Sequence, residues 1–219
     1  MKSYIAKRFQ HTGGGLSLDT AALEKYSDVI DLSIGDTDFV TDRAIIDAAY
    51  RDACAGHTHY GDPRGDKELI RAICTAWQED FRQAVTPDHV LITASSCLGM
   101  ALVMLTILDP GDEVIVFSPY FSMYRSQIEL AGGVCVEVPT YAEEQYAIDP
   151  GRLRAAITPR TRAIIFNNPT NPTGMAYDRP ALELLADVAR EHDLLIAADE
   201  IYTTYLYEGD FRPLRTLPG

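Results

Sequence analysis

The sequence has 219 residues, a hydrophobic fraction of 47%, a charged fraction of 23% and a formal net charge of -13. This length and composition are ordinary for a soluble globular protein of one or two domains with a sizeable core. The acidic balance argues against nucleic acid or an anionic membrane as a partner, because both attract basic surfaces.

The cysteines form neither a C-x-x-C pair nor a metal-finger pattern, and they are scattered along the chain: Cys54, Cys74, Cys97 and Cys135. Such usage is typical of a reduced, intracellular protein. The N-terminus has no apolar run of signal-peptide type, and no stretch approaches the apolar length of a transmembrane helix. We therefore expect a cytoplasmic protein. His57 and His59 lack a third ligand nearby, so no metal site is predicted.

Taken in chain order, residues 1–40 have no regular pattern and predict an irregular N-terminal arm. Amphipathic patterns then predict helices over residues 44–55 and about 66–83. Beyond them, short apolar strands alternate with helices. The strands are predicted over residues 89–93, 113–117, 134–138, 162–167 and 194–199, and the helices over 98–108, 120–131 and 180–192, with another starting at Pro150. This order indicates an α/β fold, with a mostly parallel sheet sandwiched by helices.

Unusual residues directly follow four of these predicted strands. In an open parallel sheet, ligands bind beyond the carboxyl ends of the strands. Four loops therefore converge on one edge, which favours a binding site there. The loops are Ser95–Cys97, Pro119–Phe121, Asn167–Gly174 and Asp199–Tyr202.

Two of the loops carry groups suited to an anion and to a cation. Ser96 and Cys97 would lie at a helix N-terminus, where free N–H groups and the helix dipole suit a phosphate; a plain helix cap is the simpler reading. Asp199 ends an apolar strand, so its carboxylate needs a partner. A protonated heterocyclic nitrogen, an arginine or a helix N-terminus would each serve.

The most distinctive segment is Asn168-Pro-Thr-Asn-Pro-Thr-Gly174. Two prolines and a glycine fix the backbone of a tight loop and hold the Asn171 amide available to donate. A rigid loop directly after a core strand favours a functional role over a simple connection.

Five motifs occur in the order and spacing of class I/II aminotransferases, the fold-type-I pyridoxal 5′-phosphate enzymes, which this chain resembles from about residue 30 onward. They are Tyr60–Gly65, Asp109–Val114, Ser118–Phe121, Asn168–Gly174 and Asp199–Tyr202. The resemblance implies that residues 1–40 are the arm and a small-domain segment. Residues 41–219 would then be a truncated large domain that binds pyridoxal phosphate.

The resemblance also implies roles for single residues around the cofactor ring. Asp199 resembles the acid that pairs with the pyridine nitrogen, which keeps the ring protonated. Tyr202 and Asn171 resemble the groups that hydrogen-bond the phenolic oxygen. Phe121 occupies the position of the aromatic side chain that stacks on the ring.

Further roles concern the phosphate and the substrate. Ser96 and Cys97 match the phosphate-binding turn, where many relatives carry Gly-Ala or Gly-Ser. Tyr60 resembles the tyrosine that reaches the phosphate of a neighbouring subunit, which implies a homodimer. Gly35 resembles the glycine near the substrate carboxylate, although Thr37 replaces the usual proline of that motif. The resemblance assigns Asn171 to the substrate as well.

Family members bind the cofactor covalently through a lysine, which also carries the proton. The lysines here are Lys2, Lys7, Lys25 and Lys67, and none matches that motif. The arginine that clamps the substrate carboxylate is missing too. We therefore assign no catalytic residue and expect a fragment that is itself inactive, with an incomplete sheet and exposed apolar surface. The parent enzyme would transfer an amino group between an amino acid and a 2-oxo acid.

Two alternatives remain open at this point. A pyridoxal-phosphate-dependent carbon–sulfur β-lyase uses the same binding residues, and nothing visible separates it from an aminotransferase. A lysine-less, non-catalytic binding module, or the sensor half of a transcription regulator, is the second. The acidic chain and the lack of room for a DNA-binding domain in the first 40 residues argue against the regulator.

Overall fold

A computed structural model describes residues 4, 28, 30, 35 and 38–217, so most of the predicted arm lies outside the described residues. The described chain forms α2 (Arg43–Cys54), α3 (Lys67–Phe81), α4 (Ser96–Ile107), β1 (Glu113–Ser118), α5 (Met123–Leu130), β2 (Val134–Pro139), α6 (Pro150–Ala155), β3 (Thr161–Asn167), α7 (Arg179–His192) and β4 (Leu195–Asp199). Short 3₁₀ turns connect some of them, at Pro87–His89, Ala142–Glu144, Thr203–Tyr205 and Leu214–Thr216.

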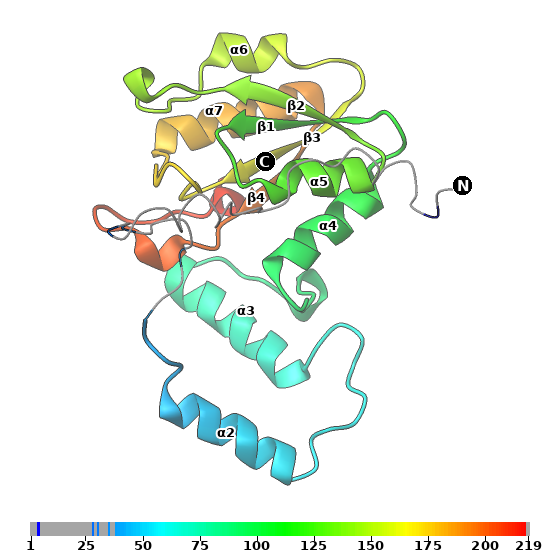
Figure 1. The fold of residues 1–219 in the computed structure, drawn as a ribbon, viewed down its shortest axis with the longest axis vertical. Coiled ribbons are helices and arrows are strands. Elements are labelled where there is room, and N and C mark those ends of the chain that lie inside the picture. Colours follow the sequence, from blue (N-terminus) through cyan, green and yellow to red (C-terminus); the bar gives the residue numbers. More distant parts are fainter. Residues whose placement is uncertain (1–3, 5–27, 29, 31–34, 36–37, 218–219) are drawn as a thin grey trace.

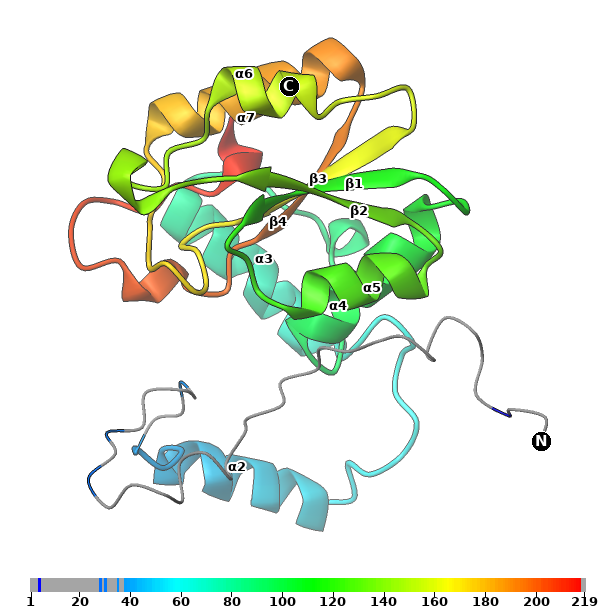
Figure 2. The same ribbon diagram turned by 45° about the horizontal axis from the view of Figure 1, so that its top comes forward.

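The four strands form one parallel sheet in the order β2-β1-β3-β4. Helices α6 and α7 cover one face of it, and α4 and α5 lie on the other (Figure 2). The predicted α/β fold, a parallel sheet sandwiched by helices, is confirmed.

The central strands are apolar on both faces because each face is covered. Val114 and Val116 of β1 pack with α4 and α5, while Ile115 and Phe117 pack with α6 and α7. All four are buried, and β3 repeats the same alternation. This two-sided burial explains why the strands appear as continuous apolar runs in the sequence.

One predicted strand is wrong. Residues 89–93 do not join the sheet, although their side chains have the expected apolar pattern. The backbone there is engaged elsewhere, because the Ile92 N–H donates to the Arg64 carbonyl at 2.9 Å. The Arg64 guanidinium also donates to the carbonyl oxygens of Pro87 and Val90. Among the described residues no strand lies beside this segment to pair with it.

Two helices start more than one residue away from the predicted position. Helix α4 begins at Ser96, two residues early, because the Ser95 hydroxyl caps it and accepts from the Leu98 N–H at 3.1 Å. Helix α5 begins at Met123, three residues late, because residues 119–122 form a non-helical connection after β1. The delay places Phe121 in the loop beyond β1.

Helix α2, strand β4 and part of α4 leave apolar side chains exposed. Helix α2 has no buried residue and stands apart from the sheet (Figures 1 and 2). Strand β4 pairs only with β3 among the described strands, and Leu195 on it is 58% exposed. Exposed apolar side chains on α4 accompany this open edge: Leu98, Leu102, Val103 and Leu105. In the described part of the chain, no helix is both long and apolar enough to cross a membrane.

Candidate functional site

The carboxyl ends of the parallel strands bring the predicted loops together. Asn167 ends β3 and Asp199 ends β4, and the two are paired in the sheet register. The Asn167 side-chain amide donates to the Asp199 carbonyl at 2.8 Å, and the Asn168 N–H donates to the same oxygen at 3.0 Å. The two loops that carry Asn171 and Tyr202 therefore start from one fixed point.

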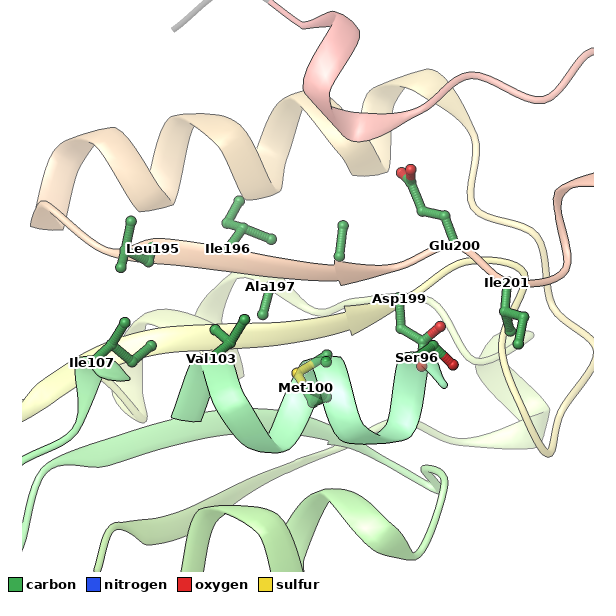
Figure 3. Close-up of a pocket in the computed structure, with 12 residues that line it drawn as sticks. Ser96, Met100, Val103, Ile107, Leu195, Ile196, Ala197, Asp199, Glu200 and Ile201 are labelled. Atoms are coloured by element: carbon green, nitrogen blue, oxygen red, sulfur yellow. The ribbon is translucent and has the colours of Figure 1, made fainter. Parts of the chain in front are cut away.

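A pocket of about 490 Å³ lies between α4 and β4. Figure 3 shows Ser96 and Asp199 together at one end of this pocket, whereas Ile107 and Leu195 lie at the other. The rest of the lining is almost entirely apolar. The polar groups are thus concentrated where the strands end, which is the arrangement expected of a ligand that is oriented by a few polar contacts.

The Asp199 carboxylate accepts a hydrogen bond from the Tyr124 hydroxyl, with an oxygen–oxygen distance of 2.7 Å. Tyr124 lies on α5 and is 2% exposed. Burial, and after it the negative charge of Asp199, raise the pKa of the Tyr124 hydroxyl well above its usual range. The tyrosine therefore remains a neutral donor, and the carboxylate is the acceptor.

The side chain of Glu200, the next residue, lies on the opposite face of the strand from that of Asp199 (Figure 3). Its carboxylate accepts from the Leu214 N–H at 2.7 Å. Burial raises the pKa of Glu200. The two neighbouring acids are therefore separated by the sheet, and Asp199 alone faces α4.

The loop after β3 brings Asn171 next to Tyr202. The Asn171 side-chain amide lies 3.4 Å from the Tyr202 hydroxyl, and the Asn171 N–H donates to the Asn167 side-chain oxygen at 2.6 Å. Within the loop, the Gly174 N–H donates to the Thr170 carbonyl, and Gly174 has a φ of +71°, which a side chain would disfavour. The predicted tight loop is present, and Asn167 anchors it.

The N-terminus of α4 offers backbone donors. The N–H groups of Ser96 and Cys97 have no acceptor among the described residues. From α5, the Gln127 side-chain amide donates to the Cys97 carbonyl at 2.9 Å and approaches its sulfur at 3.2 Å. Gln127 is 4% exposed, and its hydrogen bond holds the first turn of α4 against α5.

Phe121 lies beside this group of residues. It is half-buried, and its ring meets the Tyr124 ring edge-on with a centroid separation of 5.6 Å. Phe121 is therefore tied to the same tyrosine that contacts Asp199.

Two predicted residues stand apart from the others. Tyr60 is fully exposed and makes no hydrogen bond or ring contact with any described residue. Gly35 is exposed, with nothing within 4 Å of the position a side chain would take.

None of the described residues supplies a lysine to this group. Lys67 lies on the surface near Asp62, with 3.9 Å between its ammonium nitrogen and the carboxylate, and the other three lysines lie outside the described residues.

Two residues of this site, Tyr124 and Gln127, were not predicted from the sequence, and Asn167 was predicted only as the first residue of its loop. The signal for the first two was a tyrosine and a glutamine three residues apart, which share one face of a helix. The signal for Asn167 was a polar residue that ends an otherwise apolar strand.

Comparison with known proteins identifies the family of the chain. Residues 27–217 match the family Aminotransferase class I and II. An aspartate/prephenate aminotransferase of Thermus thermophilus is 43% identical over 192 residues, which cover 87% of this chain and 50% of that protein. An arginine–pyruvate transaminase of Pseudomonas aeruginosa is 36% identical over 199 residues, which cover 91% of this chain and 51% of that protein.

A solved structure of a Thermus thermophilus aspartate aminotransferase single mutant superimposes with a TM-score of 0.91 at 39% identity, covering 98% of this chain and 57% of that one. The chain thus spans about half the length of the curated relatives it matches. The family match extends over most of the chain and includes every strand-end loop described above. The chain belongs to the class I and II aminotransferase family.

Proposed function

We propose that this chain forms much of the pyridoxal-phosphate-binding part of an enzyme that transfers an amino group between an amino acid and a 2-oxo acid. The observation that carries the proposal is the Asp199 carboxylate at the polar end of the pocket. The aminotransferase and transaminase names of the relatives support the reaction type, and none of them favours a β-lyase.

Enzymes of this family use pyridoxal phosphate, and the residues present fit that group. The cofactor needs a partner for its ring nitrogen, donors for its phenolic oxygen and donors for its phosphate. Asp199 provides the first, the Asn171–Tyr202 pair the second, and the unpaired N–H groups of Ser96 and Cys97 the third. Ser96 at the start of a 12-residue helix adds the favourable end of the helix dipole.

When bound, pyridoxal phosphate supplies an electron sink for negative charge that develops on the substrate. The chain's own residues would set the protonation of the cofactor ring and its orientation. The Asp199 carboxylate would keep a proton on the ring nitrogen, and Phe121 would pack on the ring. Asn171 and Tyr202 orient the phenolic oxygen by donating to it. We assign proton transfer at the substrate carbon to no residue of this chain, and we expect the 219-residue chain to be inactive by itself.

Finer features of the proposal rest on the resemblance. We propose a homodimer in which the exposed Tyr60 reaches a neighbouring subunit, and we place Gly35 and Asn171 near the substrate carboxylate. We keep the division into a 1–40 segment and a 41–219 large domain. A cytoplasmic location is supported by four unpaired cysteines.

Binding of pyridoxamine 5′-phosphate tests the proposal. This aminated cofactor form is fluorescent and cannot react with surface lysines, so it reports on the noncovalent contacts alone. We expect saturable binding by the chain. Asp199→Asn should weaken it roughly 10- to 100-fold, because one charge-assisted hydrogen bond is lost. Asp80→Asn, on the exposed surface of α3, is the matched control and should bind like the unsubstituted chain.

Two outcomes would count against the proposal. One is the absence of saturable binding by the unsubstituted chain. The other is equal weakening by Asp199→Asn and Asp80→Asn, because the lost affinity would then reflect general charge rather than a contact in the pocket.

A further inference from the structure

We propose that Tyr124 is a positioning residue for Asp199, and that its hydroxyl holds the carboxylate in the orientation that receives the ring nitrogen of the cofactor. The inference rests on the function proposed above. It adds a residue that acts through Asp199 and makes no contact with the pocket itself.

The ring of Tyr124 is held in place by its neighbours in the core. Its ring is 2% exposed and belongs to the core cluster formed by α4, α5 and one face of the sheet. The ring meets Phe121 edge-on and stacks on Tyr120, with centroid separations of 5.6 and 6.4 Å. A side chain held in this way places its hydroxyl at one point in space.

That point lies 2.7 Å from one carboxylate oxygen of Asp199, 75 residues further along the chain. Among the described residues, no other side chain donates to this carboxylate. Rotation of the carboxylate would break its one bond with the protein. The Tyr124 hydroxyl therefore sets the direction in which the Asp199 carboxylate faces.

A second hydrogen bond fixes helix α5, and so it also fixes the position of the Tyr124 hydroxyl relative to Asp199. Gln127, one turn beyond Tyr124, donates to the Cys97 carbonyl at the start of α4. The same face of α5 therefore contacts both the strand end that carries Asp199 and the helix start that carries Ser96. A shift of α5 would move the Tyr124 hydroxyl relative to both.

The test compares two ligands on the same protein. One is pyridoxamine 5′-phosphate, and the other is its analogue in which a C–H group replaces the ring nitrogen. The analogue keeps the phosphate and the phenolic oxygen, but it cannot pair with Asp199. Affinities are measured for the unsubstituted chain, Tyr124→Phe and Tyr177→Phe. Tyr177 is the control, since its hydroxyl donates to the Tyr146 carbonyl at 3.0 Å and interacts with the Thr170 side chain, and it has no hydrogen bond with Asp199.

We expect Tyr124→Phe to weaken pyridoxamine phosphate binding roughly 3- to 30-fold. It should change the affinity for the analogue less than about twofold, whereas Tyr177→Phe should change both affinities by the same factor, since both ligands keep the phenolic oxygen. In an Asp199→Asn background, adding Tyr124→Phe should have no further effect, because the two residues act as one unit.

Three results would overturn the inference. Equal weakening for both ligands would mean that Tyr124 only supports the fold. Unchanged binding of pyridoxamine phosphate by Tyr124→Phe, with a normal unsubstituted chain, would remove the inference and leave the proposed function intact. Failure of the unsubstituted chain to bind pyridoxamine phosphate at all would overturn the proposed function and the inference together.

Discussion

Two acidic residues, Glu113 and Asp199, lie at opposite ends of the parallel strands and have different numbers of hydrogen-bond partners. Glu113 begins β1 and is 4% exposed, and it accepts from the Thr158 hydroxyl at 2.5 Å and from Arg160 at 2.6 Å. Asp199 ends β4 in a pocket and has one side-chain donor, Tyr124. A carboxylate with a full set of protein partners stabilises the fold, whereas one with spare capacity suits a ligand.

Glu113 predicts a specific dependence of stability on pH. The hydrogen bond from Thr158, and then that from Arg160, hold its pKa below the usual value of 4.5. Because the pKa is lower in the folded than in the unfolded state, the stabilisation is complete above about pH 4.5 and is lost as the pH falls through the folded-state pKa. Glu113→Gln should lower the free energy of unfolding by about 1–3 kcal/mol at pH 7.

The same substitution should also reduce the loss of stability between neutral and acidic pH. Urea unfolding at a series of pH values measures both effects. Glu79→Gln, on the exposed surface of α3, is the control and should leave the pH profile unchanged. An unaltered acid slope in Glu113→Gln would contradict the assignment.

At this scale the sequence predicted which loops meet at the strand ends better than which side chains support those loops. Asp199, Asn171 and Tyr202 belong to motifs close to strand ends, and the structure brings Asn171 and Tyr202 within 3.4 Å. Tyr124 could not be predicted in the same way. Its role depends on α5 packing against the end of a strand 75 residues away, and no local pattern encodes that distance.

At the scale of whole elements, local chemistry accounts for most boundaries. Aspartates cap α2, α3, α6 and α7 through hydrogen bonds to backbone N–H groups of the first turn, and each is visible in the sequence. The segment 89–93 shows the limit of such reasoning. Its side chains satisfy a strand pattern, but a strand also needs a neighbour, and the neighbour is a property of the whole fold.

Gly65 provides a test of how this extended segment is held. Its φ is +115°, and a Cβ atom there would lie 2.3 Å from a side-chain carbon of Ile92. Gly65→Ala should therefore force apart the loop before α3 and residues 90–93, which we expect to lower the free energy of unfolding by roughly 1–3 kcal/mol. Thermal and urea unfolding measure the change.

Gly61 in the same loop is the matched control. It has no positive φ, and nothing lies within 4 Å of its Cβ position, so Gly61→Ala should be neutral. Equal stability of the two variants would show that the Gly65–Ile92 approach does not hold this segment.

At the scale of the whole molecule, the loops of the candidate site meet because the strands are parallel. Strands β1, β3 and β4 all end at one edge, and β4 reaches it only after α7 has crossed the sheet. The order of elements predicted this convergence from sequence alone. The open side of β4 and the apolar part of the pocket depend on which strands lie side by side, and the sequence pattern does not specify that order.

The central claim is that Asp199 keeps a proton on the ring nitrogen of the cofactor. Nitrogen-15 NMR of ring-labelled pyridoxamine 5′-phosphate bound to the chain, at a pH above the pKa of the free ring nitrogen, tests it most directly. We predict the chemical shift of a protonated nitrogen in the complex and that of an unprotonated nitrogen in Asp199→Asn. An unprotonated nitrogen in the complex with the unsubstituted chain would contradict the account.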